Sequence, residues 1–492
     1  MPLKVLFASS EVFPLIKTGG LADVSGSLPS ALQKLGVDIR VIVPGYPSVL
    51  EQLSDIQHLA MLNDLPVINE VELLLGTITE NQVKVIVVKS ALLYERGGGP
   101  YADANGQEWP DNGVRFGVFS KVAAILSSPN SPLPDWRPDI VHCNDWQTGL
   151  IPAYMKLVDH TPAKSIISLH NMAFQGCYPY EMVETLNLPT SAFIMEGLEY
   201  YGQLSFLKAG IFYADSITTV SPGYAQEIQT EAFGFGLQGL LAKRSHEIIG
   251  ILNGIEPEEW NPETDSYLVK NYSQTRLAGK KQVKKALQQK LRLNVDANAP
   301  LLGIVSRLTD QKGLDLFLPI VQNLLDAGCE LALLGSGDPD LEMAFRDLAT
   351  HNPGKASVTI GYNEPLSHQI MAGCDLFIMP SRFEPCGLNQ LYGLAYGTPP
   401  VINKTGGLAD SVMDANEPNI RDKTATGFIM QDASVEALLA CIERALKLYR
   451  NEPKVWRQLQ KNGMSQNLSW DKSALEYLNL YQTLTGKESI ED

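Results

Sequence analysis

The 492-residue chain has few cysteines and no excess of positive charge, and these shortages exclude several classes of protein. Its six cysteines show no C-x-x-C spacing, so neither a disulfide framework nor a zinc finger is indicated. The formal net charge of −16 argues against a nucleic-acid or anionic-membrane partner, because such surfaces require a basic stripe.

Long apolar runs are also missing. No run reaches the ~18 residues that span a bilayer, and no secretory segment precedes the first apolar run, which starts at Lys4. We therefore expect a soluble protein of the cytoplasm, or of the plastid stroma if a transit peptide has been removed.

The remaining composition is that of a globular protein, with 45% hydrophobic and 19% charged residues. The length exceeds one ordinary core and favours two or three domains. Apolar runs alternate with helical segments in both halves of the chain, which predicts two Rossmann-like, doubly wound parallel α/β domains. We place the N-terminal domain at 1–248, the C-terminal domain at 249–465, and a final helix and tail at 466–492 that return to the first domain. A lysine-rich stretch at 280–285 predicts a helix face exposed to solvent.

One heptapeptide, Lys-Thr-Gly-Gly-Leu-Ala-Asp, occurs at 17–23 and again at 404–410. Each copy follows a short apolar run and leads into helical spacing. Paired glycines let the backbone approach a ligand, and the N–H groups of a helix N-terminus suit a phosphate. A plain turn before a helix is the alternative for either copy alone. Two identical copies favour two related domains that form the jaws of one central cleft.

Several polar residues follow predicted strands, where ligands bind in doubly wound folds. Arg307 and Lys312 share one strand-to-helix loop and could neutralise a diphosphate, although a surface loop is the alternative. Glu384 follows a buried-looking strand and could face the same crevice or cap the next helix. Asp145 and His170 follow two strands of the first half in the same way.

Two other patterns suggest a metal site and a sugar-binding surface. Asp338-Pro339-Asp340 matches an Asp-x-Asp metal motif, but we expect Asp340 to be the N-cap of a helix at 341–349. No catalytic metal and no other cofactor is therefore predicted. Tyrosines in polar, glycine-rich segments, among them Tyr94, could stack on sugar faces or merely cover a core.

Taken together, these motifs resemble the bacterial and plant glycogen and starch synthases, from the first strand to the last helix. The segments that carry the resemblance are Lys17-Thr18-Gly19-Gly20-Leu21, Asn144-Asp145-Trp146, Ser168-Leu169-His170-Asn171, Leu252-Asn253-Gly254, Ser306-Arg307-Leu308, Gln311-Lys312-Gly313 and Arg382-Phe383-Glu384-Pro385-Cys386-Gly387-Leu388. The resemblance implies a retaining glucosyltransferase of the GT-B architecture. Such an enzyme transfers glucose from ADP-glucose to the non-reducing end of an α-1,4-glucan or maltooligosaccharide.

The resemblance also implies residue roles. Arg307 and Lys312 would hold the donor diphosphate, Glu384 would bind the transferred glucose, and His170 and Asp145 would contact its hydroxyls. The other implied donor-binding residues are Lys17, Gly19, Gly20, Asn253, Tyr362, Cys386, Gly387, Leu388, Thr405, Gly406 and Gly407, and Tyr94 and Asn112 lie on the implied acceptor side.

The chain departs from the family pattern at two positions. Tyr392 stands where many related transferases have a second carboxylate, and Asn144 stands where bacterial members usually have histidine. Ligand contact by Lys404 or Asn389 is left open.

Two other functions are alternatives. A glucan phosphorylase would need pyridoxal phosphate, and no lysine has a distinctive Schiff-base context. A glucan-binding protein without activity would not need Lys17, Arg307, Lys312 and Glu384, which are all present. The preference for ADP- over UDP-glucose, the product glucan, the processivity and the oligomeric state are not determined by these residues.

Overall fold

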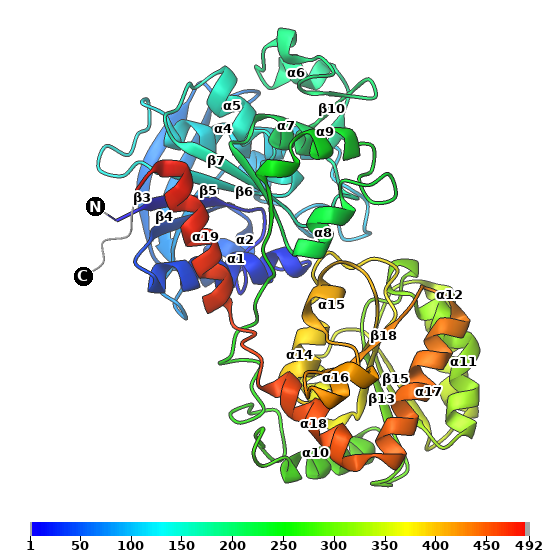
Figure 1. The fold of residues 1–492 in the computed structure, drawn as a ribbon. Coiled ribbons are helices and arrows are strands. Elements are labelled where there is room, and N and C mark those ends of the chain that lie inside the picture. Colours follow the sequence, from blue (N-terminus) through cyan, green and yellow to red (C-terminus); the bar gives the residue numbers. More distant parts are fainter. Residues whose placement is uncertain (1, 488–492) are drawn as a thin grey trace. The chain divides into compact units, whose positions relative to one another are not determined.

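The computed structural model describes residues 2–487 and divides them into two compact units (Figure 1). Unit 1 combines the chain up to Asn253 with the chain from Trp470 onward, and unit 2 is Gly254–Ser469. These divisions fall a few residues after the domain ends predicted at 248 and 465. Within residues 2–487, no helix combines the length and the apolar character that crossing a membrane requires.

Unit 1 is built on a nine-stranded sheet in which β1 is central. Its strands, in spatial order, are β12 (Ile248–Gly250), β11 (Ser216–Thr219), β7 (Lys164–Leu169), β6 (Ile140–Asn144), β1 (Lys4–Ala8), β2 (Asp38–Pro44), β5 (Lys84–Lys89), β4 (Glu70–Thr77) and β3 (Ser54–Asn63). The strands from β12 to β5 pair in parallel. Their apolar runs are almost wholly buried, as expected for a sheet that helices cover on both faces.

The antiparallel edge formed by β3 and β4 was not predicted. Much of β3 is exposed, and its polar and apolar residues do not alternate cleanly, so its sequence lacks the period of a half-buried strand. A small second sheet contains β8 (Cys177–Tyr178), β10 (Gln203–Ser205) and β9 (Glu199–Tyr200). The helices of this unit are α1 (Gly20–Lys34), α2 (Pro47–Gln52), α3 (Ala91–Tyr94), α4 (Asn112–Ser127), α5 (Ile151–Leu157), α6 (Glu181–Thr185), α7 (Phe206–Tyr213), α8 (Pro222–Glu227), α9 (Gln238–Lys243) and α19 (Trp470–Thr485).

The C-terminal helix packs on the N-terminal domain, as predicted. Figure 1 shows α19 beside α1, although more than four hundred residues separate them in the chain. The Tyr481 hydroxyl lies 2.6 Å from Nδ1 of the buried His142, whose Nε2 lies 2.6 Å from the Ser168 hydroxyl. Burial lowers the pKa of His142 to about 3, so this histidine is neutral and structural.

Unit 2 contains a six-stranded sheet whose strands are all parallel. In spatial order they are β15 (Ala356–Ile360), β14 (Glu330–Gly335), β13 (Leu301–Val305), β16 (Leu376–Met379), β17 (Pro400–Asn403) and β18 (Phe428–Met430). The helices are α10 (Ala278–Lys290), α11 (Leu314–Asp326), α12 (Pro339–His351), α13 (Glu364–Gly373), α14 (Asn389–Ala395), α15 (Gly406–Ser411), α16 (Glu417–Arg421), α17 (Val435–Asn451) and α18 (Pro453–Met464). The largest core cluster packs β13 and β14 against α11 and α17.

The lysine run of α10 is only partly a solvated face, which corrects the prediction. Lys280 and Lys284 are each 5% exposed, whereas Lys281 and Lys285 one position further on are exposed. The Lys284 ammonium donates to Asp375 at 2.7 Å and to the Ala299 carbonyl at 2.6 Å. A spacing of four residues puts both buried lysines on the inner face of the helix, where buried acceptors satisfy their charge.

Both sheets reverse their strand order at one point. In unit 1 the chain moves outward from β1 on one side and from β6 on the other, and in unit 2 the same reversal separates β13 from β16. In doubly wound folds, ligands bind at the carboxyl edge beside such a reversal. The candidate residues of each unit follow these strands.

Candidate active site

The charged cluster of unit 2 lies at the strand reversal. Lys312 ends a short 3-10 turn after β13, and Glu384 follows β16. The Lys312 ammonium lies 2.5 Å from the Glu384 carboxylate, with the side chains 16% and 9% exposed, and the Ser381 hydroxyl donates to the same carboxylate oxygen at 3.2 Å. Arg307 is exposed in the loop after β13, with its guanidinium 3.4 Å from Gln311. The exposed guanidinium of Arg307, the Lys312 ammonium and the Glu384 carboxylate thus follow β13 and β16 at one edge of the sheet.

Neighbouring residues hold these two loops together. Arg382 forms two ion-pair contacts with Asp315 on α11, at 2.7 and 2.5 Å, and its backbone N–H donates to the Gln311 carbonyl. Gly313 adopts a φ of +69°, and a Cβ there would lie 2.2 Å from the Pro380 carbonyl oxygen. Asn389, left open above, donates to the Val305 carbonyl at 2.6 Å and so ties α14 to β13. The positions of Lys312 and Glu384 are therefore set by contacts that exist without a ligand.

The second copy of the heptapeptide packs against the Glu384 loop. The Gly407 N–H donates to the carbonyls of Glu384 and Pro385, and Thr405, Gly406 and Gly407 are buried. Gly406 has a φ of +41°, and a Cβ there would lie 2.2 Å from the Glu384 carbonyl oxygen. These glycines are needed for contact with the protein backbone, and the ligand contact expected of them stays a prediction. Lys404 is exposed at the start of this turn.

The first copy, in unit 1, has the opposite surroundings. A Cβ at Gly19 or Gly20 would meet no atom of residues 2–487 within 4 Å, and both glycines are exposed. The Lys17 ammonium pairs with Asp23 of its own helix at 2.7 Å. The space around both Cα atoms is therefore open, and ligand contact at this glycine turn stays a prediction.

Sequence reasoning gave no specific role to Glu11, which occupies part of this turn. Its buried carboxylate accepts from the Gly19 N–H at 3.2 Å and from the Thr18 hydroxyl at 2.6 Å, and the Tyr101 hydroxyl donates to it. The Thr18 N–H also donates to it at 2.5 Å, so the carboxylate takes the place that an anion would have on two N–H groups of this turn. Its position three residues after the end of β1 was the only feature that marked it.

Asp145 and His170 come together after β6 and β7. The Asp145 carboxylate accepts from the His170 N–H at 2.7 Å, and Asp145 itself has a φ of +55°. Burial raises the pKa of Asp145 to about 7 and lowers that of His170 to about 4, so the imidazole is neutral near pH 7.

Asn144 orients the His170 ring. Its amide nitrogen donates to the Ala8 carbonyl at 3.0 Å, which leaves its oxygen to face His170 Nε2 at 2.9 Å. Nε2 must then carry the proton, and Nδ1 is an acceptor. The asparagine that departs from the family pattern is therefore a positioning residue for His170.

The remaining predicted residues differ in how exposed they are. Tyr362 is 79% exposed after β15, where its hydroxyl donates to Glu364. Asn253 is 8% exposed, and its side-chain oxygen has no hydrogen-bond partner among the described residues. Gln390 donates to the carbonyls of Cys386 and Gly387 and so braces the turn that leads through Leu388 into α14.

The two residues predicted for the acceptor side, Tyr94 and Asn112, are buried, and their contact with an acceptor stays a prediction. Tyr94 is fully buried, with its hydroxyl donating to the Arg115 carbonyl at 2.9 Å. Asn112 is 4% exposed and bonds both Arg115 and the Tyr101 carbonyl. Both side chains therefore belong to the core in this structure, because a glycine-rich flank does not by itself place a tyrosine at the surface.

The Asp-x-Asp motif has a capping role, but the capping residue is not the one predicted. Asp338 is the N-cap of α12 and accepts from the N–H groups of Asp340 and Leu341 at 2.9 and 3.2 Å. The helix begins at Pro339, two residues before the predicted start at 341, because proline is favoured at the first helical position. Tyr392, where a second carboxylate was missing, stacks on Trp260 with ring centroids 3.6 Å apart.

Comparisons with known proteins agree with this geometry. Residues 4–243 match the starch synthase catalytic domain family, and residues 283–463 match the glycosyl transferases group 1 family. The chain is 49% identical to a glycogen synthase of Nitrosospira multiformis over 99% of its length and 98% of that protein. It is 51% identical to a glycogen synthase of Nitrosomonas eutropha, covering 99% and 97% of the two chains.

Solved structures show the same fold. The catalytic domain of starch synthase IV from Arabidopsis thaliana, bound to ADP and acarbose, matches with a TM-score of 0.88 and 30% identity over 99% of this chain and all of that one. A sucrose-phosphate synthase from Thermosynechococcus elongatus matches with a TM-score of 0.59 at 16% identity, which shows the shared fold alone.

Proposed function

Because the chain belongs to the glycogen and starch synthase family of glycosyltransferases, we propose specific roles for the residues of both units in its reaction. The enzyme transfers glucose from ADP-glucose to the non-reducing end of an α-1,4-glucan with retention of configuration. The relatives named glycogen synthase, and the solved starch synthase with its ADP and acarbose, support this assignment.

The Lys312–Glu384 pair carries the proposal for the donor side. Breaking the anomeric bond builds negative charge on the diphosphate, and a fixed cation at that place stabilises the transition state without reorganisation. Lys312 and the exposed Arg307 supply that charge. Glu384 keeps Lys312 in position at 2.5 Å and presents its carboxylate to the transferred glucose.

The residues of unit 1 act on the sugar. His170 is neutral, and its Nδ1 accepts a hydrogen bond from a glucose hydroxyl while Asn144 holds Nε2. Asp145 accepts from backbone N–H groups and from a second hydroxyl. None of these groups is assigned as a nucleophile, and retention is then explained by same-face attack of the acceptor hydroxyl, whose proton passes to the departing phosphate.

The exposed backbone at Gly19 and Gly20, with Lys17, approaches the donor, and Tyr362 stacks near its adenine. Asn253 contacts the same sugar as His170, and Thr405, Gly406, Gly407, Cys386, Gly387 and Leu388 act by supporting the Glu384 loop. No metal or other cofactor takes part in catalysis. The same proposal includes a cytoplasmic location and no nucleic-acid or membrane partner.

One experiment tests reaction and donor together. Purified enzyme receives a labelled maltooligosaccharide with ADP-glucose or UDP-glucose, and product lengths are resolved. We expect chains longer by single glucose units, formed faster from ADP-glucose, and unchanged rates when EDTA and then magnesium or manganese are added. Absence of elongation would refute the activity, faster use of UDP-glucose would refute the donor, and an activity restored by magnesium or manganese would refute the metal-independent mechanism.

A further inference from the structure

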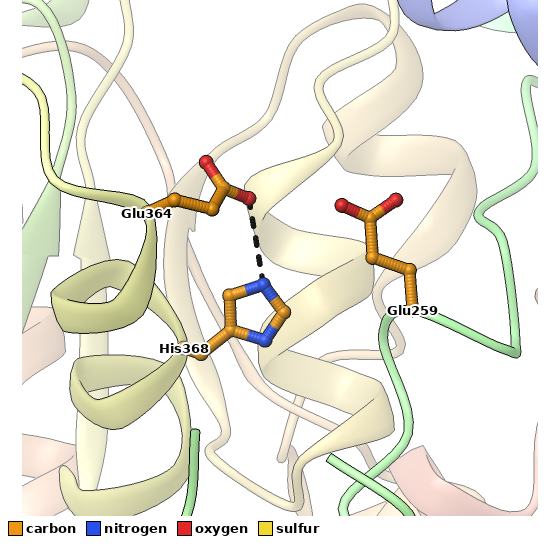
Figure 2. A group of neighbouring side chains, drawn as sticks. All are labelled: Glu259, Glu364 and His368. Carbon is orange, nitrogen blue, oxygen red and sulfur yellow. Dashed lines mark ion pairs between the residues drawn. The ribbon is translucent and has the colours of Figure 1, made fainter. Parts of the chain in front are cut away.

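Three metal-ligating side chains of unit 2 converge away from the charged cluster described above. Glu259, Glu364 and His368 each offer one ligand atom, and these atoms all lie within 4.8 Å of one another. Figure 2 shows the two residues of α13 one turn apart on the same face of the helix, with Glu259 reaching toward them from a separate loop. The spacing of four residues along the helix places Glu364 and His368 side by side.

His368 is prepared for a ligand on one nitrogen. Its side chain is 1% exposed, and Nδ1 lies 2.8 Å from the Asp265 carboxylate, which also accepts from the Tyr396 hydroxyl at 2.6 Å. A carboxylate that holds one ring nitrogen is the usual support of a metal-binding histidine, because it fixes both the tautomer and the ring orientation.

The other nitrogen, Nε2, faces the two glutamates. It is buried and makes no hydrogen bond of good geometry among the described residues, and its contact with Glu364 Oε1 is an ion pair at 3.4 Å (Figure 2). A buried polar atom without a hydrogen bond is costly, so a ligand that it can bind would be stabilising. The ring cannot turn away, because Trp260 stacks on it with centroids 3.9 Å apart.

We propose that Glu259, Glu364 and His368 Nε2 bind one Zn²⁺ ion, with water as the fourth ligand. One imidazole and two carboxylates suit zinc, whereas magnesium and calcium prefer oxygen ligands alone. Ligands about 2.1 Å from a tetrahedral ion lie roughly 3.5 Å apart. The exposed Glu259 and the half-buried Glu364 therefore move inward by side-chain rotation on binding.

The ion joins the first loop of unit 2, which carries Glu259 and Trp260, to the start of α13. Its role is structural and separate from the chemistry of Lys312 and Glu384. The competing arrangement is an ion triad without metal, in which His368 pairs with Asp265 and Glu364. Burial alone lowers the pKa of His368, but the neighbouring Asp265 and Glu364 raise it to about 9. In that arrangement a proton on His368, and not a metal ion, balances the carboxylate charge.

Titration of the full-length, chelator-treated protein with ZnCl₂ by calorimetry tests the proposal. We expect one zinc per chain, at least 10-fold weaker binding in Glu259→Gln and Glu364→Gln, and unchanged binding in the control Glu258→Gln, which alters the exposed neighbouring carboxylate. Cobalt(II) in place of zinc should give the visible absorption of a four-coordinate site, and Glu259→Gln should lose it.

The proposal is overturned if no stoichiometric zinc binds, or if Glu259→Gln binds zinc as tightly as Glu258→Gln. Either result assigns the cluster to the ion triad. Because Glu259 is exposed, its substitution leaves the core intact, and circular dichroism verifies this. Neither readout uses glucosyl transfer, so the result does not depend on the proposed function.

Discussion

The two copies of the heptapeptide allow one substitution to be compared in two environments. At Gly406 the backbone has a φ of +41°, and a Cβ would lie 2.2 Å from the Glu384 carbonyl oxygen. At Gly19 the φ is −155°, and within residues 2–487 no atom lies within 4 Å of an added Cβ. The same change to alanine should therefore destabilise the protein at Gly406 and have little effect on stability at Gly19.

The magnitude follows from these contacts. Alanine in left-handed backbone costs roughly 1–2 kcal/mol, and overpacking a filled site costs about 1–3 kcal/mol more. Gly406→Ala should therefore lose about 2–5 kcal/mol of unfolding free energy, whereas Gly19→Ala should change it by less than about 1 kcal/mol. Because the displaced atom belongs to Glu384, a shift of about 1 Å should also lower kcat by on the order of 10²-fold.

Urea denaturation followed by circular dichroism measures the first quantity, and elongation of a maltooligosaccharide from ADP-glucose measures the second. Gly19→Ala should instead raise the KM for ADP-glucose, because its Cβ would occupy the open space that the donor approaches. Equal losses of stability in both variants would refute the reasoning. So would a Gly406→Ala enzyme with unchanged kcat.

Three other changes test separate parts of the structure. Lys312→Ala should lower kcat by on the order of 10²-fold or more in the same assay, and near-native turnover would remove Lys312 from the proposed site. Lys284→Met should lower the free energy of unfolding in urea by about 3–5 kcal/mol, because it leaves the Asp375 charge buried without its partner. The exposed control Lys285→Met should leave that free energy almost unchanged. Equal losses in the two variants would contradict the burial of Lys284. Asp145 has a folded-state pKa of about 7, above its usual 3.8, so the folded protein holds an extra proton and loses stability as the pH rises from about 4 through 7. Asp145→Asn should thus gain stability relative to wild type across that window, and a pH-independent difference would show that the carboxyl is not shifted.

The fold and the family could be predicted because their determinants are local. Alternating apolar runs and helical spacing are properties of short segments, and they predicted the parallel strands of both sheets except the short edge strand β18. The glycine turns, Arg307, Lys312 and Glu384 directly follow such strands, so their place at a carboxyl edge followed from chain direction alone. The exposed edge strand β3 escaped prediction, since pairing with β4 and not its own periodicity makes it a strand.

The sequence by itself therefore determined the two α/β domains, the family and most of the residues proposed for the reaction. Only the tertiary structure decided which identical or neighbouring residues are buried. It separated the open Gly19 from the packed Gly406, placed Lys284 inside and Lys285 outside, and moved Tyr94 into the core. It also brought Glu11 onto the first glycine turn and Glu259 near His368, which lies more than a hundred residues away. Burial and long-range contacts depend on what the rest of the chain packs against each residue, and no short segment contains that information.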